Sequence, residues 1–264
     1  MKPYVIGIDM GGTNTVFGIV DARGVVIASS SIKTAKHNNF DDYIDELHEE
    51  LTRLVKANDA EGKVHGIGIG APNANYYTGE ITDGVNLPWP TPIPLARKIE
   101  EKFGIPCAIT NDANAAAIGE MTYGAARGMK DFIMITLGTG VGSGIVINGA
   151  VVYGHDGFAG ELGHMIVKRT NGRLCGCGRA GCLEAYCSAT GVARTAREFL
   201  EIRNEPSLLR NIPIDEITSK DVYDAAIAGD KIAKEIFEYT GTILGEAMAD
   251  MTVFSSPQAF ILFG

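Results

Sequence analysis

Residues 4–13 read YVIGIDMGGT, an apolar run that ends in an aspartate, a pair of glycines and a threonine. Short apolar runs that lead into glycines are typical of buried strands that carry a loop at one end. The amides of Gly11 and Gly12 can approach phosphate oxygens closely, and the hydroxyl of Thr13 adds a further donor. The carboxylate of Asp9 can hold Mg²⁺ through water. These residues form a candidate phosphate loop, although a tight hairpin turn without a ligand is the competing interpretation.

The residues around this loop predict an α/β domain. Strands are expected at 16–20, 25–31, 64–70 and 108–110. Helices are expected at 40–55, where apolar residues recur at helical spacing, and from Pro94 to Phe103. One face of the first helix should therefore pack on the sheet.

A second series with the same order of residues begins after about position 128. When the first series is shifted along the chain, Gly12-Thr13 falls on Gly138-Thr139, and Val25-Val26 falls on Val151-Val152. Each series reads as a strand, a glycine loop and two antiparallel strands, so we expect two domains of related topology with a cleft between them. Gly138, Thr139 and Gly140 then form a second candidate phosphate loop. Neither loop has the glycine spacing of a P-loop or of a Rossmann dinucleotide site.

We place an N-terminal α/β domain at residues 1–118 and a larger C-terminal α/β domain at residues 119–264. From Ser188 onward the pattern is mostly helical, with Ser219 as a helix cap and an amphipathic run at 232–253. An apolar strand is expected at 259–263. Because such a strand would normally lead into a further glycine loop, we expect the chain to end early.

Asn111 and Asp112 follow an expected strand and precede an alanine-rich stretch that favours a helix. The dipole at a helix N-terminus favours an ionised carboxylate, which can accept a proton. In phosphoryl transfer such a base orients the attacking hydroxyl and takes its proton. Asp112 is therefore the candidate catalytic base. Helix capping by Asn111 or Asp112 is the alternative, and the two roles do not exclude each other.

His164, Cys175, Cys177 and Cys182 offer one imidazole and three thiolates, which is the ligand set of a tetrahedral zinc site. Four protein ligands leave no open position for water, so we expect a structural Zn²⁺ and not a hydrolytic one. Buried or redox-active cysteines are the alternative interpretation.

Glu161 and Glu184 stand near these metal ligands in the sequence. Zinc would fix both of their loops, and the second ring nitrogen of His164 could form a hydrogen bond within a cleft. Carboxylates accept hydroxyl donors, so a sugar is the natural candidate ligand, and a wrong epimer would leave a buried acceptor unpaired. Solvated surface acids are the alternative interpretation.

The composition restricts the classes of partner. The chain has 264 residues, a formal net charge of −9 and an isoelectric point near 5.1. This charge opposes binding to nucleic acid or to an anionic membrane surface. The sequence has neither a signal peptide nor an apolar run long enough to span a membrane, so a cytoplasmic location is expected.

In order and spacing, these motifs resemble the ROK family of repressors and sugar kinases. The similarity rests on residues 9–13, 137–140, 160–164 and 175–184 and covers nearly the whole chain. It implies an actin-like (ribonuclease H-like) ATPase fold, with two α/β domains around a central cleft. It also implies Asp112 as the base and a hexose bound by Asn86, Asn111, Glu161, His164 and Glu184.

The resemblance further implies ATP with Mg²⁺ as the phosphate donor, a homodimer, and transfer of phosphate to the 6-hydroxyl of glucose. Kinases for fructose, mannose, allose or an N-acetylhexosamine and a non-catalytic sugar sensor are the alternatives. A sensor is less favoured because it needs no base beside phosphate loops. The family's kinases continue past a strand such as 259–263 into residues that hold adenosine, so weaker nucleotide binding is expected here. The repressors carry an N-terminal helix-turn-helix segment that is not found before Tyr4, so DNA binding is not expected.

Overall fold

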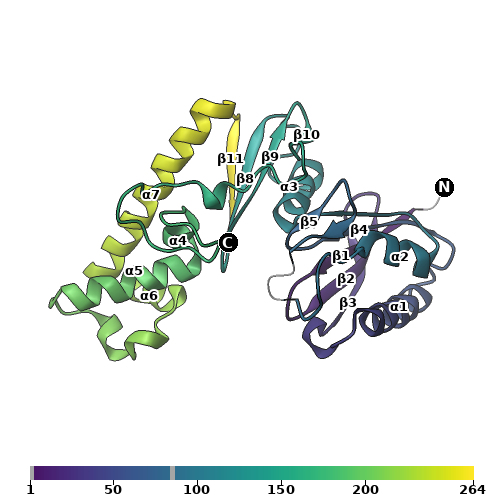
Figure 1. The fold of residues 1–264 in the computed structure, drawn as a ribbon, viewed down its shortest axis with the longest axis horizontal. Helices are drawn as coiled ribbons and strands as arrows, with labels where there is room; N and C mark the ends of the chain where they lie inside the picture. The colour runs from purple at the N-terminus through teal and green to yellow at the C-terminus, as the bar shows by residue number, and fades with distance from the viewer. Residues whose placement is uncertain (1–2, 84–86) are drawn as a thin grey trace. The chain divides into compact units, whose positions relative to one another are not determined.

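The computed structural model describes residues 3–83 and 87–264, and its contacts divide this mixed α/β protein into two compact units (Figure 1). Unit 1 comprises Met1–Met129 and Ile145–Ala159, and unit 2 comprises Lys130–Gly144 and Gly160–Gly264. The expected boundary between residues 118 and 119 lies inside helix α3 (Asp112–Tyr123). The division into domains 1–118 and 119–264 stays a prediction.

Unit 1 is built on a five-stranded sheet in the order β3-β2-β1-β4-β7. Its strands are β1 (Tyr4–Met10), β2 (Thr15–Asp21), β3 (Val26–Ile32), β4 (Val64–Gly70) and β7 (Cys107–Thr110). β1, β2 and β3 pair antiparallel in succession, whereas β4 runs parallel to β1 and β7 parallel to β4. The strands expected from the sequence are confirmed, with ends that differ by one or two residues. A short hairpin of β5 (Ala74–Asn75) and β6 (Glu80–Ile81) follows β4.

Two helices of unit 1 pack against its sheet and close the core (Figure 1). They are α1 (Phe40–Ala57), which contacts β2 and β3, and α2 (Leu95–Phe103), which contacts β7. Leu47 and Leu51 of α1 are almost fully buried in the same core as Ile6 and Ile8 of β1. Each buried side chain of this size contributes about 1.5–3 kcal/mol to folding. The apolar face read from the sequence is therefore the face that stabilises unit 1.

The second sheet has the strand order β10-β9-β8-β11. Its strands are β8 (Phe132–Leu137), β9 (Val141–Ile147), β10 (Ala150–Val151) and β11 (Ala259–Phe263). β8, a glycine loop, β9 and β10 repeat the order of β1, its glycine loop, β2 and β3, which confirms the repeated pattern of the sequence. β11 adds a parallel partner to β8, with Ala259 opposite Phe132.

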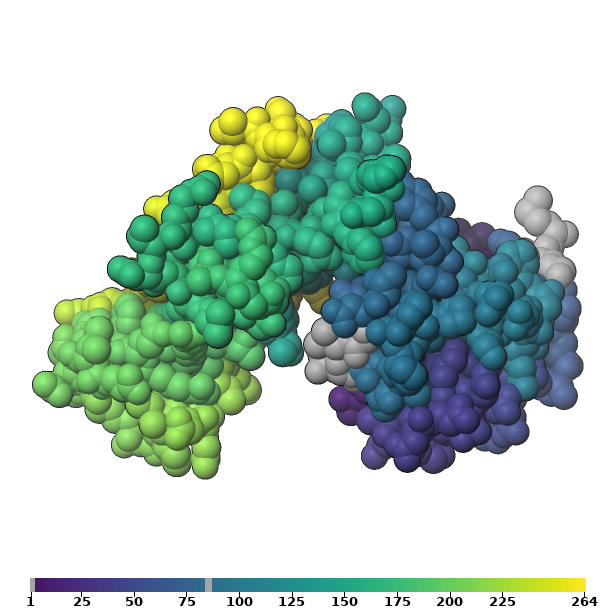
Figure 2. Space-filling view, in the orientation of Figure 1, coloured from purple at the N-terminus to yellow at the C-terminus, as the bar shows by residue number. Residues whose placement is uncertain are grey.

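The α-helices of unit 2 pack on one another around an apolar core. They are α4 (Glu184–Cys187), α5 (Ala189–Ile202), α6 (Ser219–Ile227) and α7 (Lys231–Ser255). In the space-filling view, the light green residues of α5, α6 and the segment between them form one closely packed lobe (Figure 2). Among residues 3–83 and 87–264, no helix is both long and apolar enough to cross a membrane.

The cap of α6 differs from the prediction. Ser219 is the cap expected from the sequence, whereas the structure places the N-cap at Thr218 and makes Ser219 the first helical residue. The side chain of Thr218 accepts a hydrogen bond from the Asp221 amide, and the Asp221 carboxylate accepts one from the Thr218 amide. This reciprocal capping box satisfies two amides, so it is favoured over a single bond from the neighbouring serine.

Candidate functional site

Asp9, the predicted Mg²⁺ ligand, and Asp112, the predicted base, lie at the same edge of the unit 1 sheet. In the parallel part of the sheet, Asp9 of β1 stands opposite Gly70 of β4, and Gly70 stands opposite Thr110 of β7. Asp112 is two positions beyond Thr110 and begins α3. Since parallel strands end together, the topology itself brings the two carboxylates to one edge.

Gly70 allows α3 to approach this edge closely. A Cβ atom on Gly70 would lie 3.6 Å from the Cα of Asp112 and 3.2 Å from the Cβ of Ala115. The second distance is shorter than an ordinary contact between carbon atoms, so a larger residue at position 70 would push the start of α3 away. Gly70 was not identified from the sequence, because only the fold brings β4 beside α3.

The pKa of the Asp9 carboxyl depends on burial and on the nearby carboxylate of Asp112. Its pKa is raised, first because surrounding protein atoms remove part of its hydration and second because Asp112 repels the ionised form. A cation between the two carboxylates would relieve this repulsion. The electrostatics of the edge thus favour a divalent metal ion near Asp9.

The first glycine loop connects β1 to β2 beside Asp9. The Gly11 amide donates to the carbonyl oxygen of Asn14 over 3.0 Å, which closes the loop on itself. Gly12 is partly exposed, and Thr13 is exposed. Solvent can therefore reach the side of the loop that carries the predicted phosphate ligands.

Asn111 and Asp112 both accept a hydrogen bond at the start of α3. The Oδ1 atom of Asn111 accepts from the Ala113 amide over 2.8 Å, and the Oδ1 atom of Asp112 accepts from the same amide over 2.7 Å. The capping interpretation is therefore confirmed for Asn111, which is the N-cap of α3, whereas Asp112 is the first helical residue. Asp112 is exposed, and a carboxylate has acceptor sites beyond one hydrogen bond, so its bond with Ala113 leaves it able to receive a proton.

The second glycine loop, residues 138–140, connects β8 to β9 in unit 2. The Oε2 atom of Glu184 accepts from the amide of Val141 over 3.0 Å. A Cβ atom on Gly140 would lie 2.5 Å from the same oxygen, so a larger residue there would require this carboxylate to move. Glu184, predicted as a sugar ligand, also holds the end of the phosphate loop.

The start of α5 holds the other end of this loop. The Ala189 amide donates to the carbonyl oxygen of Gly138 over 2.9 Å, and the Thr190 hydroxyl donates to that of Thr139 over 3.1 Å. These two donors were missed by the sequence analysis. Nothing in the local pattern relates α5 to a loop so far away in the chain.

Ser143 of β9 positions the segment that carries Glu161. Its hydroxyl donates to the carbonyl oxygen of Gly160 and accepts from the amide of Leu162 over 3.1 Å. Glu161 immediately precedes a short 3-10 helix, η2 (Leu162–His164). Ser143 is therefore a further residue of this region that the sequence did not reveal.

Gly163→Ala is expected to destabilise unit 2 strongly. A Cβ atom at position 163 would lie 2.0 Å from the carbonyl oxygen of Val141, too close for any side chain. Because backbone must move, we expect a loss of about 3 kcal/mol or more in the free energy of unfolding. Thermal unfolding checks this, with Gly245→Ala as the control, since nothing lies within 4 Å of a Cβ atom there. Equal melting temperatures for the two variants would contradict the close packing.

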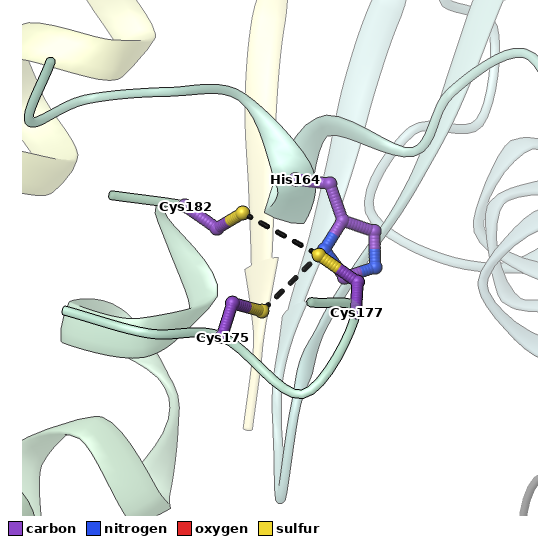
Figure 3. Close-up of side chains that lie close together, drawn as sticks. All are labelled: His164, Cys175, Cys177 and Cys182. Carbon is purple, nitrogen blue, oxygen red and sulfur yellow. Dashed lines mark hydrogen bonds between the residues drawn. The ribbon is translucent and has the colours of Figure 1, made fainter. Parts of the chain in front are cut away.

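The four predicted metal ligands come together in unit 2 (Figure 3). The ligand atoms of His164, Cys175, Cys177 and Cys182 all lie within 4.8 Å of one another. The Sγ atoms of Cys177 and Cys182 are 3.7 Å apart, and Nδ1 of His164 is 3.8 Å from Sγ of Cys175. Tetrahedral zinc, with bonds of about 2.3 Å to sulfur and 2.0 Å to nitrogen, requires separations of about 3.8 and 3.5 Å. The donor set and its spacing therefore fit a zinc ion.

The metal cluster is linked to the second glycine loop. The thiol of Cys175 donates to the Oε1 atom of Glu184 over 3.5 Å, while the Oε2 atom accepts from Val141. One carboxylate thus joins a metal ligand to the residue that follows the loop. A change in the cluster is expected to reach the loop through this side chain.

A comparison with known protein families agrees with the motifs of the sequence and with the geometry of the site. The matching family model is described as the ROK family and covers residues 5–264. The chain belongs to the ROK family.

The relatives of this chain include proteins named glucokinase. The chain is 37% identical over 270 residues to a glucokinase from Halalkalibacterium halodurans, covering 99% of this chain and 80% of the relative. It is 33% identical to a glucokinase from Thermotoga maritima, covering 100% of this chain and 82% of the relative. A solved ROK family glucokinase from Streptomyces griseus, in complex with glucose and AMPPNP, is 35% identical with a TM-score of 0.77 and covers 98% of this chain and 82% of its own. The predicted actin-like ATPase fold is confirmed by this likeness.

The residues predicted for the ROK site are distributed over both units. Unit 1 brings together Asp9, the first glycine loop, Asn111 and Asp112, whereas unit 2 holds the remaining described residues. The latter are Gly138, Thr139, Gly140, Glu161, His164, Cys175, Cys177, Cys182 and Glu184. The predicted hexose ligand Asn86 lies outside the described residues.

Proposed function

We propose that this ROK-family protein is an ATP-dependent hexose kinase that transfers the terminal phosphate of ATP to the 6-hydroxyl of glucose. The observation that carries the proposal is the placement of Asp112 at the same sheet edge as Asp9 and the first glycine loop. A candidate base thus stands beside a candidate site for phosphate and Mg²⁺. A protein that only binds sugar has no use for this combination.

In unit 1, Asp112 would orient the attacking hydroxyl and accept its proton as the bond to phosphorus forms. An ordinary carboxylate suffices, because the transition state of phosphoryl transfer is loose and the proton leaves late. Asp9 would hold Mg²⁺ through water. The amides of Gly11 and Gly12 and the hydroxyl of Thr13 would bind phosphate oxygens.

In unit 2, Gly138, Thr139 and Gly140 would bind phosphate oxygens of ATP. We assign the hexose hydroxyls to Glu161, His164 and Glu184 of this unit, together with Asn111 and Asn86. Glu184 already accepts a hydrogen bond from Val141. A carboxylate offers about four acceptor positions, so it can still receive a sugar hydroxyl.

The same proposal includes a structural Zn²⁺ at His164, Cys175, Cys177 and Cys182, with Mg²⁺ as the partner of ATP. When bound, Zn²⁺ would supply rigidity to the surrounding loops and no reactive position. We also propose a homodimer, as the family resemblance implies. A cytoplasmic location would provide ATP and keep the cysteine ligands reduced.

The choice of glucose is supported by the relatives. Two of them are named glucokinases, and a solved family member carries glucose and AMPPNP. Kinases for fructose, mannose, allose or an N-acetylhexosamine differ in the hydroxyl pattern that Glu161 and Glu184 would meet. A hexose that leaves one of these acceptors unpaired should react much more slowly.

Phosphorylation rates across a panel of hexoses test the proposal. With Mg-ATP, kcat/KM is expected to be highest for glucose, and the product should carry phosphate at the 6-position. A higher value for another hexose would favour one of the alternative kinases. Glucose that binds while no hexose is phosphorylated would identify a sensor and overturn the proposed activity.

A further inference from the structure

A chain of three buried hydroxyl groups lies at the base of the first glycine loop. Oγ1 of Thr15 lies 2.8 Å from Oγ1 of Thr34 and 2.9 Å from the hydroxyl oxygen of Tyr43. All three residues have an exposed fraction of 0%, so water does not compete for these hydrogen bonds. Thr15 begins β2 directly after the loop, Thr34 begins the 3-10 helix η1 (Thr34–Lys36), and Tyr43 lies on α1. The hydroxyl chain therefore joins three elements next to the predicted phosphate ligands.

The backbone of the loop is tied to the same place. The Ala35 amide of η1 donates to the carbonyl oxygen of Thr13 over 3.5 Å. Thr15 also pairs with Met10 across the base of the loop. Because a packed interior transmits small displacements, a shift of Tyr43 would reach the loop amides.

The ring of Tyr43 contacts the segment that follows the predicted hexose ligand Asn86. The ring centroids of Tyr43 and Trp89 are 4.8 Å apart, and Phe40 completes the cluster at 5.1 Å from Trp89. The indole N–H of Trp89 donates to the carbonyl oxygen of His37 over 3.0 Å, and only 5% of Trp89 is exposed. One residue thus contacts Trp89, three positions after Asn86, through its ring, and Thr15, at the end of the first glycine loop, through its hydroxyl.

We propose that Tyr43 is a positioning residue that couples hexose binding near Trp89 to nucleotide binding at the first glycine loop. This inference rests on the proposed function. Tyr43 is fully buried, so it acts through Trp89 and Thr15 and not by touching a ligand. Each ligand then stabilises the arrangement that the other requires, and the coupling must be equal in both directions.

The state of the Tyr43 hydroxyl agrees with this role. Burial raises the pKa of Tyr43 to about 12, although its hydrogen bond with Thr15 opposes the rise. The hydroxyl therefore stays protonated at neutral pH and can both donate and accept.

Intrinsic tryptophan fluorescence can report glucose binding and so measure this coupling. The sequence contains 1 tryptophan, so the emission comes from Trp89. The dissociation constant of glucose is measured in the full chain with and without AMPPNP and Mg²⁺. The coupling factor is the constant without nucleotide divided by the constant with nucleotide. We expect a wild-type factor of at least about five. Tyr43→Phe should lower it about fivefold, the effect of one hydrogen bond, while glucose affinity without nucleotide changes less than about twofold.

A pair of threonine variants provides the matched control. Thr34→Val breaks the other end of the hydroxyl chain and should also lower the coupling factor. Thr195→Val removes an equally buried hydroxyl in α5, which donates to the Gly191 carbonyl over 2.9 Å, and should leave the factor unchanged. If Tyr43→Phe does not fold, Thr34→Val still tests whether the hydroxyl chain carries the coupling.

The outcomes separate this inference from the proposed function. A coupling factor that is one in the wild type, or the same in wild type, Tyr43→Phe and Thr34→Val, overturns the inference while hexose phosphorylation stands. An equal loss in Thr195→Val also overturns it, because the effect would then be general destabilisation. Failure of glucose to bind at all contradicts the proposed function and, with it, the role of Tyr43.

Discussion

Asp112→Asn is expected to lower kcat for glucose by about 10³-fold, within the range of about 10²–10⁴ for loss of a general base. The amide keeps the size of the side chain and an oxygen that can accept from Ala113, so the cap of α3 is retained. It cannot take the proton of the sugar hydroxyl. Steady-state kinetics with Mg-ATP check this, and KM should change far less than kcat.

Asp42→Asn is the matched control for this experiment. Asp42 is an exposed aspartate in the first turn of α1, as Asp112 is in the first turn of α3. The same chemical change in the first turn of another helix should leave kcat unaltered. A kcat for Asp112→Asn within tenfold of the wild type would remove Asp112 from the role of base.

The pKa of Asp9 shows whether Asp112→Asn leaves the edge of the sheet intact. Repulsion by Asp112 contributes to the raised pKa of Asp9, so the variant should lower that pKa, which carbon NMR of the carboxyl group can follow. A carboxyl whose pKa is raised on folding contributes stability at low pH and loses it as the pH rises through the folded-state pKa. Lowering that pKa reduces the loss at neutral pH. The variant should therefore be at least as stable as the wild type, and a fall in kcat would not reflect unfolding.

Much of the sheet edge that carries Asp9 and Asp112 could be predicted because its residues follow strands. Asp9 and Asp112 each stand at the end of a short apolar run, and parallel strands bring such ends to one edge. The metal ligands could be predicted equally well from the sequence, since three of the four lie in one compact stretch with glycines between them. In both cases the information is local in sequence.

The residues that the sequence analysis missed act over long distances in the chain. Ser143 contacts Gly160 and Leu162, and Tyr43 contacts Thr15, from elements that meet only after folding. A serine in a glycine-rich strand or a tyrosine on an apolar helix face looks like an ordinary strand or core residue. The misplaced cap of α6 is a different kind of error, because Thr218 and Ser219 are both good caps and Asp221 decides between them.

Glu184 shows a third limit of sequence-based prediction. The motif marks it as a hexose ligand, and that role stays a prediction. Its contacts with Val141 and Cys175 add a structural task that no short pattern contains. A variant at Glu184 would therefore affect sugar binding and the second glycine loop together, which makes it a poor test of either.

Cys177→Ser is expected to abolish metal binding and to destabilise unit 2. Cys177 is an exposed member of the cluster, so serine removes a zinc ligand with little loss of packing. Metal content should fall from about one zinc per chain to near zero. Loss of a structural metal costs several kcal/mol, so the melting temperature should fall by about 10 °C or more. Atomic absorption and thermal unfolding measure the two effects.

Cys107→Ser separates loss of metal from loss of a thiol. Cys107 is a half-buried cysteine on β7 of unit 1, whereas the four metal ligands belong to unit 2. This variant should retain its zinc, whereas a chelator applied to the wild type should reproduce the lower melting temperature of Cys177→Ser. Because Cys182 lies two residues before Glu184, and Glu184 accepts from the Val141 amide, loosening of the cluster in the metal-free protein should also weaken AMPPNP binding. A metal-free protein that melts and binds AMPPNP like the wild type would show that the four side chains do not serve as a structural metal site.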